Sequence, residues 1–284
     1  MTEHTSTKLA VRYCPVLLVI CLICSQLSAN EIQASAASRY QPGVRNSPER
    51  PLKPAQLSAL LTSLREKSGF LEMSFDEHGF LQLGDRTRIL GGSAIARDLL
   101  VAAVDRVKGI DLENHDFSLT VAFARLAKPI EYMSRMSGAR IEVFPVEIDF
   151  TDFTHLRGDR AVIEAFDVGF VVMHELAHAA LGLRDALVNN QEPGECEEYI
   201  NLIRRDLGVP ERMSYVAKTI GRYQLASQKP MQLAELVFAY NTDENRAKPK
   251  LLNLNWEAER VCAVRRNEYK APNVNAKSQS TIAP

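Results

Sequence analysis

The chain has 284 residues, of which 46% are hydrophobic, and this is enough for a buried core in one large domain or two small ones. Lysine and arginine total 34 against 35 for aspartate and glutamate, which gives a formal net charge of −1. This balance gives no electrostatic reason to expect nucleic acid as a partner, so we expect no nucleic-acid partner and a function that resides in a specific site.

The N-terminus has the features of a secretory signal peptide. Lys8 and Arg12 precede an apolar run at residues 13–24, which is followed by a small, polar stretch that ends at Ala29. The run is shorter than the roughly 20 residues that a helix needs to cross a bilayer, and the alternative is an uncleaved N-terminal anchor. We predict that residues 1–29 are a signal peptide, that the protein is periplasmic or secreted, and that no stable membrane span remains after processing.

The remaining chain divides by composition into three parts. Residues 30–53 are rich in Ser, Ala, Pro and Arg without apolar periodicity, which predicts a flexible lead. The folded domain is expected over 54–270, and a disordered tail over 271–284. Outside the predicted signal peptide the cysteines are Cys196 and Cys262, and the sequence leaves open whether they pair or stay free thiols.

The first predicted elements are two helices separated by a hairpin. Leucines at helical spacing predict an amphipathic helix that ends at Gly69. Two short apolar segments on either side of a turn predict a hairpin over residues 70–83. A second helix is expected over 93–108, with Ser93 as its N-cap and Gly109 at its end.

Two strands are predicted next. Residues 117–123 and 141–150 alternate apolar and polar side chains, as strands with one buried face do. Pro145 lies inside the second segment and favours an edge position or a bulge, because proline has no backbone N–H to donate. An edge strand just before the candidate catalytic helix could receive an extended substrate by strand addition.

The C-terminal half is expected to contain two further helices and two further strands. The first of these helices ends at Gly182, which is a natural C-cap. The four segments are helices at 166–181 and 195–207 and strands at 233–240 and 251–256. We therefore predict an α+β fold with a small sheet in the N-terminal half.

The segment with the clearest chemical meaning is His174-Glu175-Leu176-Ala177-His178. On a helix the two histidines lie about one turn apart, so both imidazoles leave the same face and can bind one tetrahedral zinc ion. Glu175 projects about 100° around the helix from His174, where it can take a proton from water without being a ligand. The alternative is a core helix whose polar groups satisfy one another.

A catalytic zinc site needs a third protein ligand, and three residues are candidates. Asp185 follows the turn at Gly182, so a reversing chain could bring its carboxylate back to the metal. Glu197 lies on the next helix, where Asn201 one turn further along could orient it. His155 precedes the motif and is the weaker choice.

Residues 173–215 resemble the zincin metallopeptidase domains of some bacterial secreted effectors and polymorphic toxins. The resemblance rests on the histidine motif with the turn that follows it, and on the segment 201–215. In that family an aspartate commonly follows the turn glycine by three residues, as Asp185 does, which favours it as third ligand. The family usually has a glutamate immediately before the asparagine, where this chain has Ile200, and this departure keeps Glu197 as the alternative.

The resemblance implies a zincin-like metallopeptidase domain in which a helix carries the metal motif. It also implies that Tyr215 stabilises the developing oxyanion, while a tyrosine that only packs at a helix end is the alternative. We expect a hydrolase with Zn²⁺ as cofactor and a protein or peptide as substrate, in which His174, His178 and Asp185 bind the metal and Glu175 is the general base. The alternative function is a catalytically silent zincin-fold binding or assembly module of the cell envelope.

Overall fold

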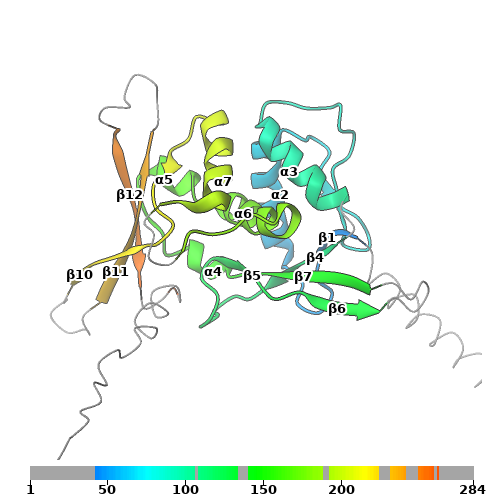
Figure 1. The fold of residues 1–284 in the computed structure, drawn as a ribbon, viewed down its shortest axis with the longest axis horizontal. Helices are drawn as coiled ribbons and strands as arrows, with labels where there is room; N and C mark the ends of the chain where they lie inside the picture. Colours follow the sequence, from blue (N-terminus) through cyan, green and yellow to red (C-terminus); the bar gives the residue numbers. More distant parts are fainter. Residues whose placement is uncertain are drawn as a thin grey trace, which may run out of the picture.

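The computed structural model describes residues 42–105, 108–133, 140–187, 192–223, 231–240, 249–258 and 261 (Figure 1). These residues form a five-stranded sheet with helices over one face, a second five-stranded sheet beside the helices, and a two-stranded hairpin. The predicted α+β class is confirmed, and the first sheet belongs to the N-terminal half as expected.

The first sheet is mixed. Its strands are β1 (Gly43–Asn46), β4 (Gly109–Asn114), β5 (Ala124–Leu126), β6 (Ile130–Met133) and β7 (Arg140–Ile148). Strand β4 lies between β1 and β7 and is parallel to both, while β5 and β6 pair in turn with the other side of β7 and are antiparallel to it. Strand β5 therefore lies at an edge of this sheet.

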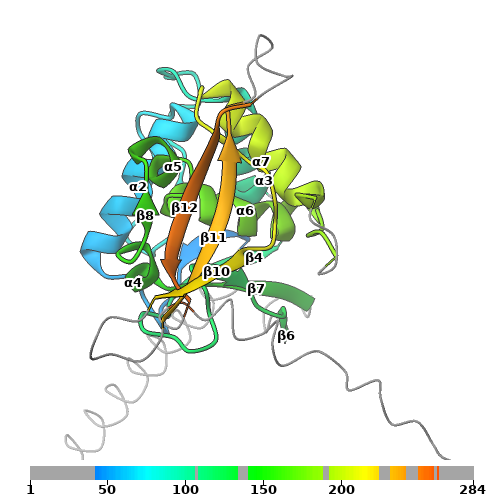
Figure 2. The same cartoon turned by 90° about the vertical axis from the view of Figure 1, so that its left-hand side faces the viewer.

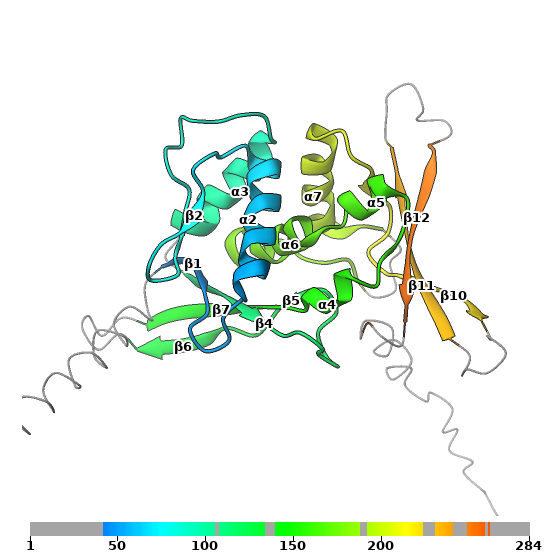
Figure 3. The same cartoon turned by 180° about the vertical axis from the view of Figure 1, so that it is seen from behind.

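Three helices lie over one face of this sheet (Figures 1 and 3). They are α2 (Pro54–Ser68), α3 (Ala94–Asp105) and α6 (Val168–Leu181). Their apolar side chains join those of the strands in one continuous core, to which α3 contributes Leu99, β4 Ile110 and β7 Val146. This core holds α6 at a fixed position above the sheet.

Helix α6 runs through the centre of the molecule and packs against α2 and α3. Its sequence is apolar nearly all round, and a helix of that kind is stable only when it is buried. Asp167 caps its start by accepting a hydrogen bond from the Phe170 N–H at 3.1 Å, and the buried Lys67 of α2 pairs with Asp167 at 2.6 Å. Gly182 ends it in the left-handed conformation, with φ of 71°.

The second sheet is antiparallel and stands beside the helices (Figure 2). Its strands are β8 (Arg157–Gly158), β9 (Glu211–Arg212), β10 (Lys218–Tyr223), β11 (Met231–Ala239) and β12 (Leu251–Glu257). Helix α7 (Gly194–Asp206) packs against α6 and α3, whereas the short helices α4 (Phe150–Phe153) and α5 (Arg160–Glu164) come just before and just after β8 in this region. A second core lies here, in which the Phe123 ring packs edge-on against Phe166 and Trp256.

Most predicted elements are present, and their ends agree to within a few residues. Gly69 ends α2 in the left-handed conformation, and Ser93 Oγ accepts a hydrogen bond from Ala96 N at 3.3 Å at the start of α3. The predicted hairpin forms from β2 (Ser74–Phe75) and β3 (Leu81–Gln82). The predicted helices at 166–181 and 195–207 and strands at 233–240 and 251–256 correspond to α6, α7, β11 and β12.

The strand predicted at residues 117–123 is wrong. This segment is a loop whose backbone N–H groups donate to side chains instead of to a neighbouring strand. Ser118 N donates to Asp149 Oδ2 at 2.7 Å, and Phe123 N donates to Asp152 Oδ2 at 2.9 Å. These two buried carboxylates satisfy the donors that a strand would need to pair, so the alternating sequence does not form one.

Pro145 was predicted to mark an edge position or a bulge. The edge position is wrong, since β7 has partners on both sides, and the pairing of β7 with β4 runs through Pro145 without a register shift. Pro145 lies opposite the break between β5 and β6, where its carbonyl accepts a hydrogen bond from Ala127 N at 2.8 Å. Because the N and C=O of a strand residue point to the same side, the missing N–H faces this break. The edge strand beside α6 is β5, which contacts that helix.

Two predicted boundaries need correction. Residues 43–46 were expected in the flexible lead, but they form β1, because Val44 enters the core and pairs with Ile110. Gly109 does not end a helix, since α3 ends at Asp105 and Gly109 begins β4. A glycine between two apolar segments is compatible with either role, so sequence alone did not separate them.

Several predictions concern residues outside the described ranges. The predicted signal peptide at 1–29 and the predicted tail at 271–284 lie outside the described residues. Cys262 also lies outside them, so a disulfide between Cys196 and Cys262 is not tested. Within the described part of the chain, no helix combines the length and the apolar character that a bilayer span requires.

Candidate metal centre

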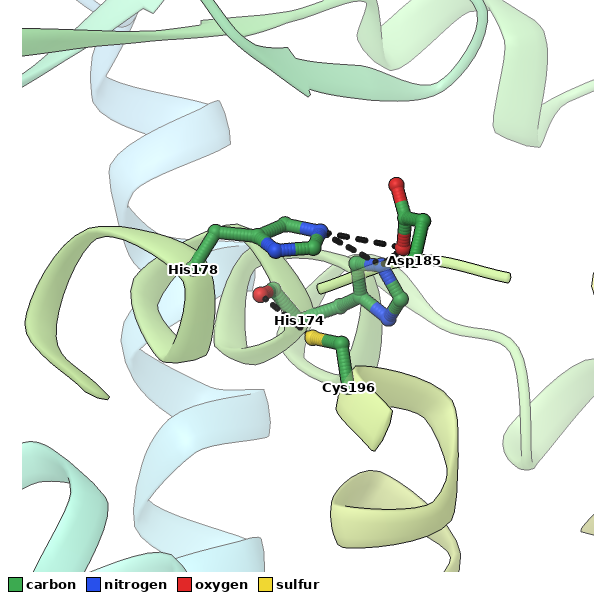
Figure 4. Close-up of side chains that lie close together, drawn as sticks. All are labelled: His174, His178, Asp185 and Cys196. Atoms are coloured by element: carbon green, nitrogen blue, oxygen red, sulfur yellow. Dashed lines mark hydrogen bonds and ion pairs between the residues drawn. The ribbon is translucent and has the colours of Figure 1, made fainter. Parts of the chain in front are cut away.

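His174 and His178 project from the same face of α6, as their spacing predicts (Figure 4). Their Nε2 atoms lie 3.1 Å apart, and the ring planes are inclined at 81° with centroids 4.8 Å apart. His174 is buried and His178 is nearly so. Two imidazoles whose nitrogens converge in this way are arranged to bind one metal ion together.

Asp185 joins the two histidines from the loop that follows α6. Its Oδ1 lies 3.0 Å from His174 Nε2 and 3.1 Å from His178 Nε2, so three donor atoms form a nearly equilateral triangle (Figure 4). Ligands of a tetrahedral zinc ion at about 2.0–2.1 Å are about 3.3 Å apart. The triangle therefore fits a metal ion held on one side of its plane.

The second nitrogen of each imidazole faces an acceptor. His174 Nδ1 lies 3.3 Å from Glu197 Oε2, and His178 Nδ1 lies 2.6 Å from the Leu183 carbonyl oxygen. When Nδ1 carries the proton, each Nε2 presents its lone pair to the centre of the triangle. The acceptors at Nδ1 therefore favour the tautomer that would bind a metal through Nε2.

Glu197 lies on the Nδ1 side of His174 and is outside the triangle of convergent atoms. Its side chain is 1% exposed, and Arg204 and Arg212 each pair with one of its oxygens. Although burial opposes ionisation, the two guanidinium groups and His174 hold the pKa of this carboxyl well below its usual range. Glu197 is therefore a charged partner of His174, and the Asn201 side-chain oxygen accepts hydrogen bonds from both of these arginines.

Glu175 is buried, and its carboxyl interacts electrostatically with His174, His178 and Asp185. Its Oε2 accepts a hydrogen bond from Leu126 N at 2.7 Å, at the outer edge of β5. Burial raises the pKa of this carboxyl, and the neighbouring histidines act in the opposite direction. The carboxylate is held in place without an arginine or lysine partner among the contacts of the described residues.

The electrostatic setting of the three convergent groups favours a cation. Burial alone lowers the pKa of the His174 imidazole, but the hydrogen bond to Asp185 and other acidic partners outweigh burial and raise it. Burial likewise opposes ionisation of Asp185, yet hydrogen bonds from the two histidines hold its pKa well below the usual range. A buried site that attracts positive charge in this way suits a metal ion.

Tyr215 reaches this centre from a distant part of the chain. Its hydroxyl donates to Asp185 Oδ2 at 2.6 Å, and its ring lies parallel to that of His174, with centroids 6.0 Å apart. Burial raises the pKa of the phenol, and the Asp185 charge adds to this, so the O–H is retained as a donor. The observed contact is with a candidate ligand, and the role at an oxyanion stays a prediction.

Cys196 is the residue near this centre that sequence reasoning missed. Its buried Sγ donates to the His174 carbonyl oxygen at 3.3 Å, and one potential ligand atom from each of His174, His178, Asp185 and Cys196 lies within 4.8 Å of the others (Figure 4). No local pattern marks this cysteine, because it enters the site through the packing of α7 on α6. The weaker candidate, His155, follows α4 and is not in this group.

Comparisons of this chain with protein-family models, with curated proteins and with solved structures gave no match.

Proposed function

We propose that this protein is a zinc-dependent hydrolase, and specifically a metallopeptidase with a zincin-like domain. One observation carries the proposal: Nε2 of His174, Nε2 of His178 and Oδ1 of Asp185 converge within 3.0–3.1 Å of one another beside the buried carboxylate of Glu175. The donor set of two imidazoles and one carboxylate suits zinc, and three protein ligands leave a coordination position open.

The chain's own groups supply the remaining chemistry. A zinc ion held by this triad would polarise a scissile carbonyl and make a water molecule more acidic. Glu175 takes the proton of the attacking water and passes it to the leaving nitrogen, which is the work of a general base and then a general acid. Its hydrogen bond from Leu126 N would hold this carboxylate in place between these steps.

The substrate class is proposed to be a peptide in extended conformation. Strand β5 is an edge strand and contacts α6, and Leu126 N points away from β7 toward Glu175. A peptide that lies alongside this edge would have its backbone close to the general base. Export to the periplasm or medium is proposed from residues 13–24, and N-terminal sequencing of the mature protein tests it.

The decisive experiment compares the wild-type protein with Glu175→Gln on a mixed peptide library in the presence of zinc. We expect cleavage by the wild type, and a loss of about 10²-fold or more in rate for the variant with zinc content unchanged. Glu198→Gln, at an exposed position of α7, is the matched control and should cleave as the wild type does. If the wild type cleaves no peptide that Glu175→Gln leaves intact, the hydrolase proposal is wrong.

A specific observation supports a second candidate, the catalytically silent binding module. Because Cys196 Sγ lies within 4.8 Å of the other potential ligand atoms, a rotation of its side chain could complete a closed site of four protein ligands, as structural zinc sites have. Cobalt substitution distinguishes the two. A thiolate ligand gives Co²⁺ an intense near-ultraviolet charge-transfer band, which we expect to be absent in the wild type. A band that disappears in Cys196→Ser would favour the silent module.

A further inference from the structure

Arg212 occupies a position where the second sheet meets the metal centre. Its backbone is fixed on two sides, since β9 pairs with β11 at Phe238, and Asn201 of α7 exchanges two hydrogen bonds with it, each of 2.8 Å. The Asn201 amide thus pairs with Arg212 as a neighbouring strand would. The side chain leaves this rigid backbone and points toward the site.

The guanidinium of Arg212 spans two groups of the metal centre. Nη1 donates to Glu197 Oε2 at 2.9 Å, Nε donates to the Ser214 carbonyl oxygen at 2.9 Å, and Nη2 donates to the carbonyl oxygen of Tyr215. The guanidinium also lies 5.3 Å from the centre of the Tyr215 ring. One side chain therefore contacts both the carboxylate behind His174 and the residue that binds Asp185.

We infer that Arg212 is a positioning residue that sets the orientation of His174 and the place of Tyr215 together. The inference rests on the proposed metal centre. On one branch, Arg212 holds Glu197, whose same oxygen lies 3.3 Å from His174 Nδ1. On the other branch it holds the backbone of Tyr215, whose hydroxyl binds Asp185 Oδ2. Two of the three candidate ligands thus depend on one guanidinium.

The chemistry of the side chain explains why arginine is needed here. A guanidinium directs five N–H donors in one plane and can serve three acceptors at fixed angles, whereas a lysine ammonium is a point donor on a flexible stem. Arg204 provides a natural comparison in the same cluster. It also pairs with Glu197, but its other bonds go to Asn201 and to the Ala165 carbonyl oxygen, not to the Tyr215 segment.

The test measures Zn²⁺ affinity by competition with a chromogenic chelator, and visible spectra of the Co²⁺-loaded protein. Arg212→Gln should weaken Zn²⁺ binding by about 10–100-fold and shift the Co²⁺ spectrum, as loss of a group behind a metal ligand does. Arg212→Lys keeps the charge and should recover part of this loss. Thermal unfolding of the metal-free variants checks that both still fold. Wild-type affinity and spectrum in a folded Arg212→Gln would overturn the inference.

A double-mutant cycle separates positioning from a general structural role. If Arg212 acts partly through Tyr215, then Arg212→Gln should reduce Zn²⁺ affinity by a smaller factor in a Tyr215→Phe background than in the wild type. The loss caused by Arg204→Lys should be the same in both backgrounds. Equal losses for Arg212→Gln in the two backgrounds would contradict the inference.

Failure of this inference differs from failure of the proposed function. A protein that binds zinc and shows the coupling but cleaves no peptide leaves Arg212 as a positioning residue and refutes the hydrolase. A protein that cleaves peptides equally well with Arg212→Gln, at unchanged affinity, refutes the role of Arg212 alone.

Discussion

The Tyr215 hydroxyl donates to Asp185 Oδ2 at 2.6 Å, while Oδ1 of the same carboxylate faces both histidines. Asp185 lies on a loop, where a side chain has more freedom than on a helix. The hydrogen bond from Tyr215 restricts that freedom, so that one oxygen is available to a metal and the other is not. The phenol thus fixes which atom of Asp185 joins the triangle.

We predict that Tyr215→Phe weakens zinc binding by about tenfold, because Asp185 loses the partner that orients it. The ring that stacks on His174 remains, so the metal-free protein should keep its unfolding temperature to within a few degrees. Chelator competition and thermal unfolding measure the two quantities. Unchanged affinity would mean that the loop alone positions Asp185. Tyr240→Phe, just after the end of β11, serves as the control.

Removal of a candidate ligand should remove the metal. His178→Ala or Asp185→Ala should reduce bound zinc from about one equivalent to a small fraction, because two ligands hold zinc far less tightly than three. Metal analysis after gel filtration gives the content directly. His155→Ala should retain a full equivalent, since His155 lies outside the cluster. A full equivalent of zinc in His178→Ala would remove the basis of the proposed centre.

Zinc should also stabilise the fold, since an ion that binds the folded state and not the unfolded state adds RT ln(1 + [L]/Kd) to the free energy of unfolding. Addition of a strong chelator should therefore lower the unfolding temperature of the wild type. The same chelator should have no effect on His178→Ala. Calorimetric scans with and without chelator make this comparison, and a chelator effect of equal size in both proteins would contradict it.

The parts of the site that the sequence could predict are those set by local geometry. His174 and His178 converge because an i, i+4 spacing on any helix brings side chains to one face, and Gly182 ends that helix because glycine adopts positive φ without strain. Asp185 follows the turn closely enough that its return to the helix could be proposed. Residues near one another in sequence need little of the fold to meet.

The parts that could not be predicted depend on contacts between distant segments. Arg212 reaches Glu197 only because β9 pairs with β11 and Asn201 holds its backbone, and neither contact has a local signature. The loop at 117–123 has the alternation of a strand, and its true structure depends on the buried carboxylates of Asp149 and Asp152. Pattern reasoning cannot detect side chains that take the place of a neighbouring strand.

Two glycines of the site offer a matched pair of substitutions, because both have positive φ but differ in their surroundings. Gly182 has φ of 71° and open space where a Cβ would lie, so Gly182→Ala should cost about 1 kcal/mol of stability from backbone strain. Gly194 has φ of 79°, and a Cβ there would lie 2.3 Å from the Ala186 backbone nitrogen. Gly194→Ala must therefore displace the segment that carries Asp185.

We predict that Gly194→Ala weakens zinc binding by about tenfold or more, whereas Gly182→Ala changes it by a smaller factor. Chelator competition on both variants, with urea unfolding to record their stabilities, tests the difference. Equal zinc affinities in Gly194→Ala and Gly182→Ala would show that Asp185 still binds the metal when the backbone at Ala186 is displaced.

Asp152 should make the stability of the fold depend on pH. The side chain is 2% exposed, and burial raises its pKa to about 7, with a smaller contribution from the nearby Asp149 charge. In the unfolded chain the same carboxyl ionises near 3.9. Between these values the folded state holds a proton that the unfolded state has lost, so the contribution of Asp152 to stability is most favourable below about pH 4 and falls as the pH rises toward 7.

We predict that the free energy of unfolding of the wild type falls by on the order of 1–3 kcal/mol as the pH rises from 5 to 8, because Asp152 must lose its proton in the folded state. Asp152→Asn should abolish this part of the change. The asparagine oxygen can still accept the hydrogen bond from Phe123 N, so the variant removes the charge and keeps the contact. Urea unfolding in the presence of a chelator measures the difference without a metal contribution. Asp159→Asn, at an exposed position, should leave the pH dependence unchanged. A pH dependence in Asp152→Asn equal to that of the wild type would mean that Asp152 is already ionised in the folded protein at pH 5.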